Sequence, residues 1–112
     1  MMKVLALNLA AGTASADVVL INAFEVPDGQ REAAIAAWEV SRDFLAEQPG
    51  YISTVLHASL SPEARFQLVN VARWESAEAF EAAIAEMRAA GASPQIEGLG
   101  INPALYTEIR RD

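Results

Sequence analysis

The chain has 112 residues, of which 53% are hydrophobic and 21% charged, and its formal net charge is -7. Length and composition predict one globular domain that can bury a core without disulfides. The acidic balance argues against nucleic acid or an anionic membrane as a partner, because both need clustered Lys and Arg. With no cysteine and a single histidine, thiolate chemistry, cysteine-bound metals and multi-histidine metal sites are excluded.

Residues 1–16 are predicted to form an N-terminal extension to a domain at residues 17–112. The extension carries Lys3, an apolar run from Val4 to Ala11, and an Ala14-Ser15-Ala16 triplet of the kind that precedes signal-peptide cleavage. The run is interrupted and the basic region is one Lys, so we expect a cytoplasmic protein, with secretion as the alternative. No segment reaches the ~20 apolar residues of a membrane-spanning helix, so no membrane partner is expected.

A strand and a helix open the domain. Residues 18–26 are nearly all apolar, and Pro27-Asp28-Gly29 has the residues of a turn. From Gln30 to Gln48, apolar residues recur near helical spacing and predict an amphipathic helix, which Pro49-Gly50 ends.

A hairpin, a second helix and a last strand follow. Strands are predicted at Tyr51–Leu60 and Arg65–Trp74, and a helix from Ser76 to Gly91. The final strand is expected near Ala104 to Arg110. This order, strand-helix-strand-strand-helix-strand, predicts the α+β class and a ferredoxin-like βαββαβ fold, with an antiparallel sheet covered by both helices on one face.

Apart from Asn22 and Glu25, the first strand is apolar on both of its faces, because Val18, Leu20 and Phe24 alternate with Val19, Ile21 and Ala23. A sheet face in contact with water should carry polar residues. The face without helices therefore needs a cover, which a second copy of the sheet supplies most simply. We expect a homodimer with a shared β-core.

One face of the third predicted strand has a single amide side chain, Asn70, among apolar residues. Asn70 and Trp74 are separated by an even number of residues, so they should project to one face together with Phe66 and Leu68. A buried amide without partners costs about 1–3 kcal/mol. A neighbouring side chain or a ligand must therefore satisfy Asn70.

The chain resembles the antibiotic biosynthesis monooxygenase family from about Asp17 to Arg110. The likeness rests on this element order, on Asn22-Ala23-Phe24-Glu25-Val26-Pro27, on Gln48-Pro49-Gly50-Tyr51, and on Asn70 followed by Trp74-Glu75-Ser76. The resemblance implies a dimeric α+β barrel. It also implies one of several functions, since the family includes quinone-forming monooxygenases without cofactor, haem-degrading enzymes and proteins with no assigned role.

The quinone-forming type uses an Asn, a Trp and a His that Asn70, Trp74 and His57 match. It also uses a Tyr where this chain has Phe80, and an Arg for which Arg88 is the nearest candidate. The resemblance therefore implies a monooxygenase that needs no cofactor or metal and oxidises a planar phenol, anthrone or quinol with O2.

Under this interpretation, His57 acts as base, Asn70 donates hydrogen bonds to a developing oxyanion, and Trp74 stacks on the ring. Further residues are predicted to bind the substrate: Asn22, Phe24, Phe66, Phe80 and Arg88.

The haem-degrading type uses an Asn in the first strand, which Asn22 matches. It also uses a Trp in the second helix, near whose position this chain has Ala83, and a histidine after that helix. No histidine follows His57, so the resemblance argues against haem degradation.

The alternative is a non-catalytic dimer that binds a small hydrophobic ligand or has a stress-associated role. In that case His57 bonds a neighbouring strand or the hairpin, Asn70 bonds a helix end or a loop carbonyl, and Trp74 packs in the core or covers the helix.

Overall fold

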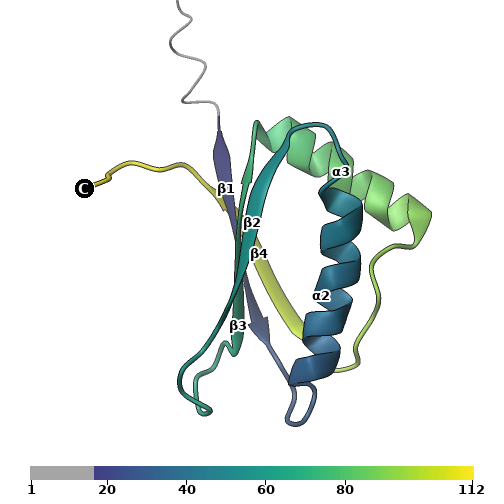
Figure 1. Ribbon diagram of the computed structural model, residues 1–112, viewed down its shortest axis with the longest axis vertical. Helices are drawn as coiled ribbons and strands as arrows, with labels where there is room; N and C mark the ends of the chain where they lie inside the picture. The colour runs from purple at the N-terminus through teal and green to yellow at the C-terminus, as the bar shows by residue number, and fades with distance from the viewer. Residues whose placement is uncertain (1–16) are drawn as a thin grey trace, which may run out of the picture.

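The computed structural model describes residues 17–112, which form an antiparallel sheet with two helices packed on one face (Figure 1). The strands pair in the order β2-β3-β1-β4. This arrangement confirms the predicted α+β class and the ferredoxin-like order, whereas residues 1–16 lie outside the described part of the chain. The elements are β1 (Val18–Glu25), α2 (Arg31–Leu45), β2 (Tyr51–Ala58), β3 (Leu68–Trp74), α3 (Ala77–Ala90) and β4 (Gly100–Tyr106).

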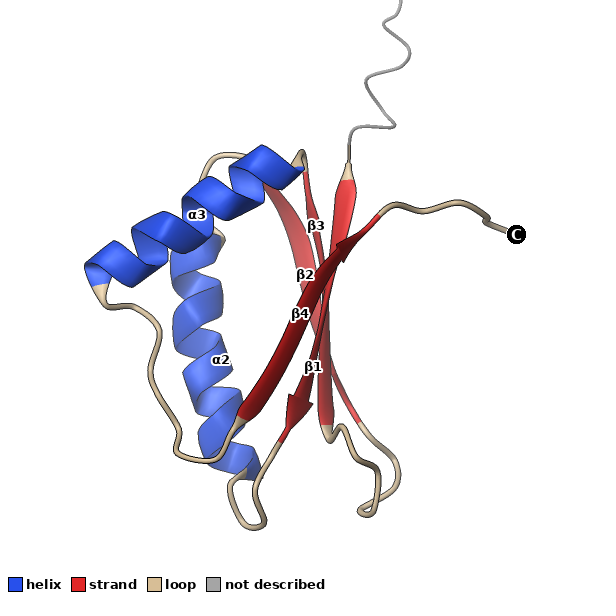
Figure 2. Ribbon diagram, turned by 180° about the vertical axis from the view of Figure 1, so that it is seen from behind, coloured by secondary structure: helices blue, strands red, loops and turns tan. Residues whose placement is uncertain are grey.

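The molecule has two layers. Figure 2, seen from behind, shows α2 and α3 on one side of the sheet and the C-terminal segment leaving on the other side. No described element covers the second face. The face toward the helices is called the inner face below, and the opposite one the outer face.

The core lies between the inner face and the helices. Along β3, residues Leu68, Asn70, Ala72 and Trp74 are buried and alternate with half-buried ones, as the period of a strand requires. The predicted shared face of Asn70 and Trp74 is thus confirmed.

Local capping explains where the second helix begins and ends. The Ser76 hydroxyl accepts a hydrogen bond from the Ala79 N–H at 3.0 Å, which satisfies one of the free donors of the first turn. Gly91 ends α3 in the left-handed conformation, with φ of 67°.

Several predicted bounds were wrong, and the largest differences are in α2, β3 and β4. The helix α2 ends at Leu45, not Gln48, because the N–H of Gln48 bonds the Leu45 carbonyl and tightens the chain into a turn. The strand β3 begins at Leu68, since the Gln67 side chain bonds the hairpin turn. The strand β4 runs from Gly100 to Tyr106 and contains Pro103, which an edge strand tolerates because one side of it needs no N–H donors.

Gly50 allows α3 to pack closely against the start of β2. Its φ is +91°, and a Cβ at this position would lie 2.5 Å from the Cβ of Ala79. We expect Gly50→Ala to lower the free energy of unfolding by about 1–3 kcal/mol, from backbone strain and the clash together. Urea unfolding measures this change.

The matched control is Gly29→Ala. Gly29 also has positive φ, at +78°, but a Cβ there meets nothing within 4 Å. Gly29→Ala should therefore lose less stability than Gly50→Ala. Equal losses in the two variants would show that the contact with Ala79 is unimportant.

Candidate functional site

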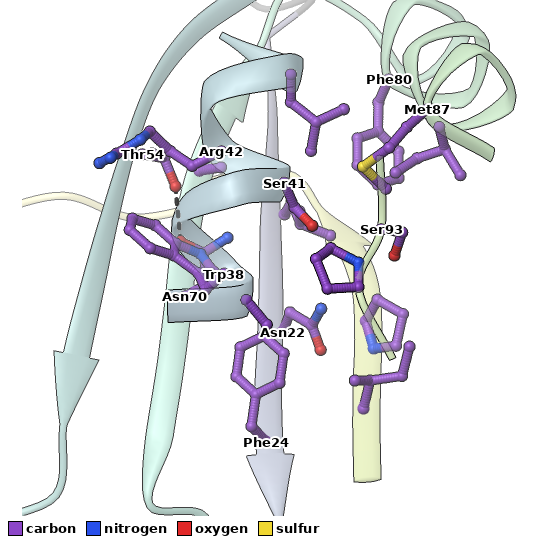
Figure 3. Close-up of a pocket in the computed structure, with 18 of the residues that line it drawn as sticks. Asn22, Phe24, Trp38, Ser41, Arg42, Thr54, Asn70, Phe80, Met87 and Ser93 are labelled. Atoms are coloured by element: carbon purple, nitrogen blue, oxygen red, sulfur yellow. Dashed lines mark hydrogen bonds between the residues drawn. The ribbon is translucent and has the colours of Figure 1, made fainter. Parts of the chain in front are cut away.

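A cavity of about 730 Å³ lies between the inner face of the sheet and the two helices (Figure 3). β1 and β3 form its floor, α2 and α3 form its walls, and residues 93–95 of the loop before β4 lie at its rim. Its size is that of pockets that hold drug-sized ligands. Its wall is predominantly apolar, with a small number of polar groups.

Asn70 is the buried polar residue of this wall, with 8% of its surface exposed. Its side-chain oxygen accepts a hydrogen bond from the Thr54 hydroxyl of β2 at 2.6 Å. The sequence suggests a helix end or a loop carbonyl as the partner of Asn70, but the partner in the structure is a side chain on the neighbouring strand.

Asn22 lies beside Asn70, because the two residues are direct partners in the register of β1 and β3. Its side-chain oxygen accepts a hydrogen bond from the Asn102 N–H at 3.0 Å. Figure 3 shows both amide groups projecting from the sheet toward the cavity.

Aromatic rings close the end of the cavity where β3 stops. Trp74 is 1% exposed and meets Tyr51 and Phe80 edge-to-face, with ring centroids 5.5 and 5.6 Å apart. Such pairs are favourable beyond the area that they bury. This cluster fixes the indole and gives the cavity a rigid apolar wall.

The charged groups at the cavity are both cationic. Arg42 of α2 and Arg88 of α3 line it, whereas none of its described lining residues is Asp, Glu, His or Lys. The Arg42 guanidinium lies 5.1 Å from the Trp38 ring centroid and pairs with Asp43 at 2.7 Å. Arg88 appears in no ion pair among residues 17–112.

Most predicted site residues meet at this cavity. Of the predicted catalytic residues, Asn70 and Trp74 line it; of the predicted substrate-binding residues, four do, namely Asn22, Phe24, Phe80 and Arg88. Phe66 does not line it, because it precedes β3 and packs against Arg65, whose guanidinium lies 5.0 Å from its ring centroid.

His57 is also absent from the cavity. It is exposed and pairs with Val69 in the register of β2 and β3, so it projects from the outer face. Its Nδ1 lies 3.3 Å from the Val69 carbonyl oxygen, to which the Nδ1–H tautomer donates. The expectation that His57 meets Asn70 and Trp74 within one protomer is therefore wrong.

Sequence reasoning missed Thr54, Tyr51 and Arg42 as lining residues. A β-bulge between Tyr51 and Ser53 shifts the register of β2, so that Tyr51 and Thr54 share the inner face despite their odd spacing. No signal in the residue types marks this bulge. Arg42 could have been found from its helical spacing with Trp38.

Two other kinds of site are absent from residues 17–112. Within residues 17–112, no three His, Cys, Asp or Glu side chains are grouped in a way that would hold a metal ion. In the same part of the chain, neither helix has the length and apolar character needed to cross a membrane.

Residues 17–86, more than half of the chain, match the family described as antibiotic biosynthesis monooxygenase. The chain belongs to this family. The matched range contains Asn22, Asn70 and Trp74, and it confirms the resemblance that the sequence motifs suggest. Arg88 and β4 lie beyond the matched range.

Two known proteins resemble the chain over different lengths. Tetracenomycin-F1 monooxygenase from Streptomyces glaucescens is 37% identical over 70 residues, which are 62% of this chain and 60% of that protein. The match thus spans less than two thirds of that relative. A solved structure of a candidate monooxygenase from Shewanella loihica PV-4 is 52% identical, covers 87% of this chain and 98% of its own, and has a TM-score of 0.80.

Two further structures share the fold. SnoaB, a cofactor-independent oxygenase from Streptomyces nogalater, has a TM-score of 0.68 at 22% identity, over 86% of this chain and 96% of its own. The heme-degrader MhuD from Mycobacterium tuberculosis, with two hemes bound, has a TM-score of 0.62 at 26% identity. The match covers 85% of this chain and 98% of the MhuD chain.

Proposed function

We propose that the protein is a cofactor-independent monooxygenase that oxidises a planar, electron-rich aromatic compound, such as a phenol, anthrone or quinol, with O2. The observation that carries this proposal is the buried amide of Asn70 in the wall of an apolar cavity. Membership of the family and likeness to a tetracenomycin-F1 monooxygenase support the monooxygenase reaction.

With an anthrone the reaction balances without an added reductant. The ring system first loses a methylene proton, and the resulting enolate passes one electron to O2. The two radicals combine through a new C–O bond to give a peroxide, which takes up a proton. Loss of the second methylene proton and cleavage of the O–O bond then give the quinone carbonyl and water.

The cavity residues match the needs of this sequence. Amide donors such as Asn70 stabilise the negative charge that develops on oxygen, and such donors act most strongly where water is excluded. Trp74, Phe80 and Phe24 hold the planar ring. Since no described lining residue is a carboxylate, imidazole or amine, we propose that the proton passes to water rather than to His57.

The test is O2 uptake by the purified protein with dithranol, an anthrone, in the presence of a metal chelator. The expected result is uptake well above the rate of spontaneous oxidation, with one labelled atom from isotopic O2 in each quinone formed. Heat-denatured protein gives the background rate. Uptake at that background rate would contradict the proposal.

Haem degradation is not proposed, although MhuD shares the fold. The one histidine of the chain, His57, lies on the outer face beside the Val69 carbonyl, and no histidine is among the described cavity residues. The residues present therefore do not fit a haem iron bound through histidine.

A non-catalytic ligand-binding role is the second candidate. Phe80 stands where the quinone-forming type has a Tyr, and the cavity has no base among its described lining residues. Under this alternative, a planar aromatic ligand raises the melting temperature, and the protein consumes no O2.

We also propose that two protomers pair through their outer faces. These faces carry Ile21 of β1, Val55 of β2 and Val71 of β3 side by side in the strand register, with Val55 53% exposed. A second copy offers a matching apolar sheet, and face-to-face packing of two sheets buries both.

Val71→Glu is expected to abolish this dimer, because the carboxylate would be buried without a partner between the sheets. Light scattering after gel filtration should give the mass of one chain for the variant and of two for the unmodified protein. Val40→Glu, on the exposed side of α2 with 48% of Val40 exposed, should remain dimeric. A dimer in both variants would contradict the outer-face interface.

A further inference from the structure

We propose that Arg42 makes the cavity selective for planar aromatic ligands that carry a carboxylate at the edge of the ring system. The inference rests on the proposed function only in taking a planar aromatic compound as the ligand. It adds a substituent that defines the ligand class and the residue that recognises this substituent.

The first observation is the place of Arg42 on its helix. Four residues recur at helical spacing along α2 and line the cavity, namely Ala34, Trp38, Arg42 and Leu45. The Arg42 side chain is 37% exposed, although burying a charge costs free energy unless a partner compensates for it. Figure 3 shows Arg42 and Trp38 on the β2 side of the cavity. The sequence thus places a cation within the apolar stripe of this helix.

The second observation is that Arg42 is held in place but keeps donors for a ligand. Its guanidinium lies 5.1 Å from the Trp38 ring centroid, within the range of a cation–π contact. Its Nε donates to Asp43 at 2.7 Å, and among residues 17–112 its terminal nitrogens, Nη1 and Nη2, form no hydrogen bond. These nitrogens present the planar fork of N–H groups that matches the oxygens of a carboxylate. Because Trp38 restrains the guanidinium, little side-chain freedom is lost on binding.

The third observation is the imbalance of charge at the cavity. The chain carries a formal charge of -7, yet no Asp or Glu is among the described lining residues. Asp43 offsets Arg42 only in part, because its side chain is 72% exposed and water screens its charge. An anionic substituent is therefore attracted to this edge of the cavity and repelled by the net charge of the rest of the chain.

Arg88, the other cation of the cavity, lies elsewhere and is held differently. It follows Met87 in α3, and Figure 3 shows Met87 on the side of the cavity opposite Arg42. Arg88 is exposed, and in the described part of the chain no aromatic ring holds its guanidinium as Trp38 holds that of Arg42. The geometry therefore assigns the carboxylate to Arg42.

The experiment uses rhein, a dihydroxyanthraquinone carboxylate, and its carboxamide. The two dyes have nearly the same shape and differ in charge, and neither has a methylene group to oxidise. Equilibrium dialysis with absorbance detection gives the Kd of each dye for the purified protein at neutral pH, where the carboxyl group is ionised. We expect rhein to bind about tenfold more tightly than the amide, as one charge-assisted contact allows. Added salt should reduce this difference.

Arg42→Gln tests the assignment, because it keeps a polar side chain and removes the charge, so most of the preference for rhein should disappear. Arg65→Gln is the matched control. Arg65 also lies over a ring, 5.0 Å from the Phe66 centroid, and pairs with Glu25 at 2.8 Å, but it does not line the cavity. This control should keep the full preference.

Asp43→Asn should act in the opposite direction. Neutralising Asp43 leaves Arg42 without its anionic partner, so the preference for rhein should rise above that of the unmodified protein. Glu32→Gln removes one negative charge from the first turn of the same helix and should change the preference much less. A gain in Asp43→Asn would not follow from a structural role of Arg42 alone, since a disturbed helix would weaken binding of both dyes.

Equal affinities of the unmodified protein for the two dyes, or failure of both to bind, would overturn the inference. A full preference in Arg42→Gln, or a loss of the preference in Arg88→Gln alone, would overturn it as well. A preference for rhein that depends on Arg42, found without O2 uptake from dithranol, would support this inference and contradict the monooxygenase. O2 uptake from dithranol without any preference for rhein would do the reverse.

Discussion

Trp74→Ala is expected to lower the free energy of unfolding by about 3–5 kcal/mol, the usual cost of truncating a buried aromatic residue. Trp74 is 1% exposed, and its removal would leave a void between β3 and α3 where Tyr51 and Phe80 lose their common partner. Urea unfolding at a fixed protein concentration measures the change, because dimer formation makes stability depend on concentration.

The matched control is the other tryptophan. Trp38 on α2 is half-buried, and the Arg42 guanidinium lies 5.1 Å from its ring centroid, so Trp38→Ala should cost less than half as much as Trp74→Ala. Equal costs would show that the aromatic cluster around Trp74 is not a centre of stability.

A conservative variant separates the two roles of Trp74. Trp74→Phe retains an aromatic ring in the core and should fold. If turnover with dithranol in Trp74→Phe equals that of the unmodified protein, the indole serves packing alone, and the predicted stacking role is contradicted.

Those parts of the fold that depend on local patterns could be predicted from the sequence. The alternation along β3 follows from the two-residue period of a strand, so the shared face of Asn70 and Trp74 needed no structure. The Ser76 cap and the Gly91 end of α3 follow from residue types that satisfy or terminate a helix turn. The order of the elements follows from the same local patterns, and the family resemblance rests in part on that order.

Those parts that depend on irregular pairing could not be predicted. Strict alternation along β2 places His57 on the same face as Tyr51, and Tyr51 does line the cavity. The bulge between Tyr51 and Ser53 reverses every residue after it, so His57 faces outward and Thr54 faces the cavity. One extra residue in a strand therefore decides which of two polar side chains can act on a ligand.

The partners of the two amides at the cavity, on Asn70 and Asn22, could not be predicted either. Asn22 and Asn102 are 80 residues apart in sequence, yet β1 and β4 bring them together. Pro103 made that segment an improbable strand by composition. The sequence indicates that Asn70 needs a partner, but tertiary pairing alone selects Thr54.

Asn70→Ala should lower kcat for dithranol oxidation about 10²–10³-fold, the range found when one donor to a developing oxyanion is removed. Stability should change far less, since Asn70 forms one described side-chain hydrogen bond, to Thr54, and a typical hydrogen bond contributes about 0.5–1.5 kcal/mol. Gln30→Ala removes an exposed amide that caps nothing through its side chain and should leave kcat unchanged.

Asn70→Asp sharpens the same test, because it keeps the shape of the side chain and exchanges the N–H donors for a carboxylate. At neutral pH this variant should be less active than Asn70→Ala, since a negative charge would face the ionised substrate. Burial raises the pKa of a carboxyl group, and below that pKa the protonated group can donate again, so activity relative to Asn70→Ala should rise as the pH falls. A pH-independent ratio between the two variants, or a kcat for Asn70→Ala within a factor of about three of the unmodified value, would mean that the amide does not touch the reacting oxygen.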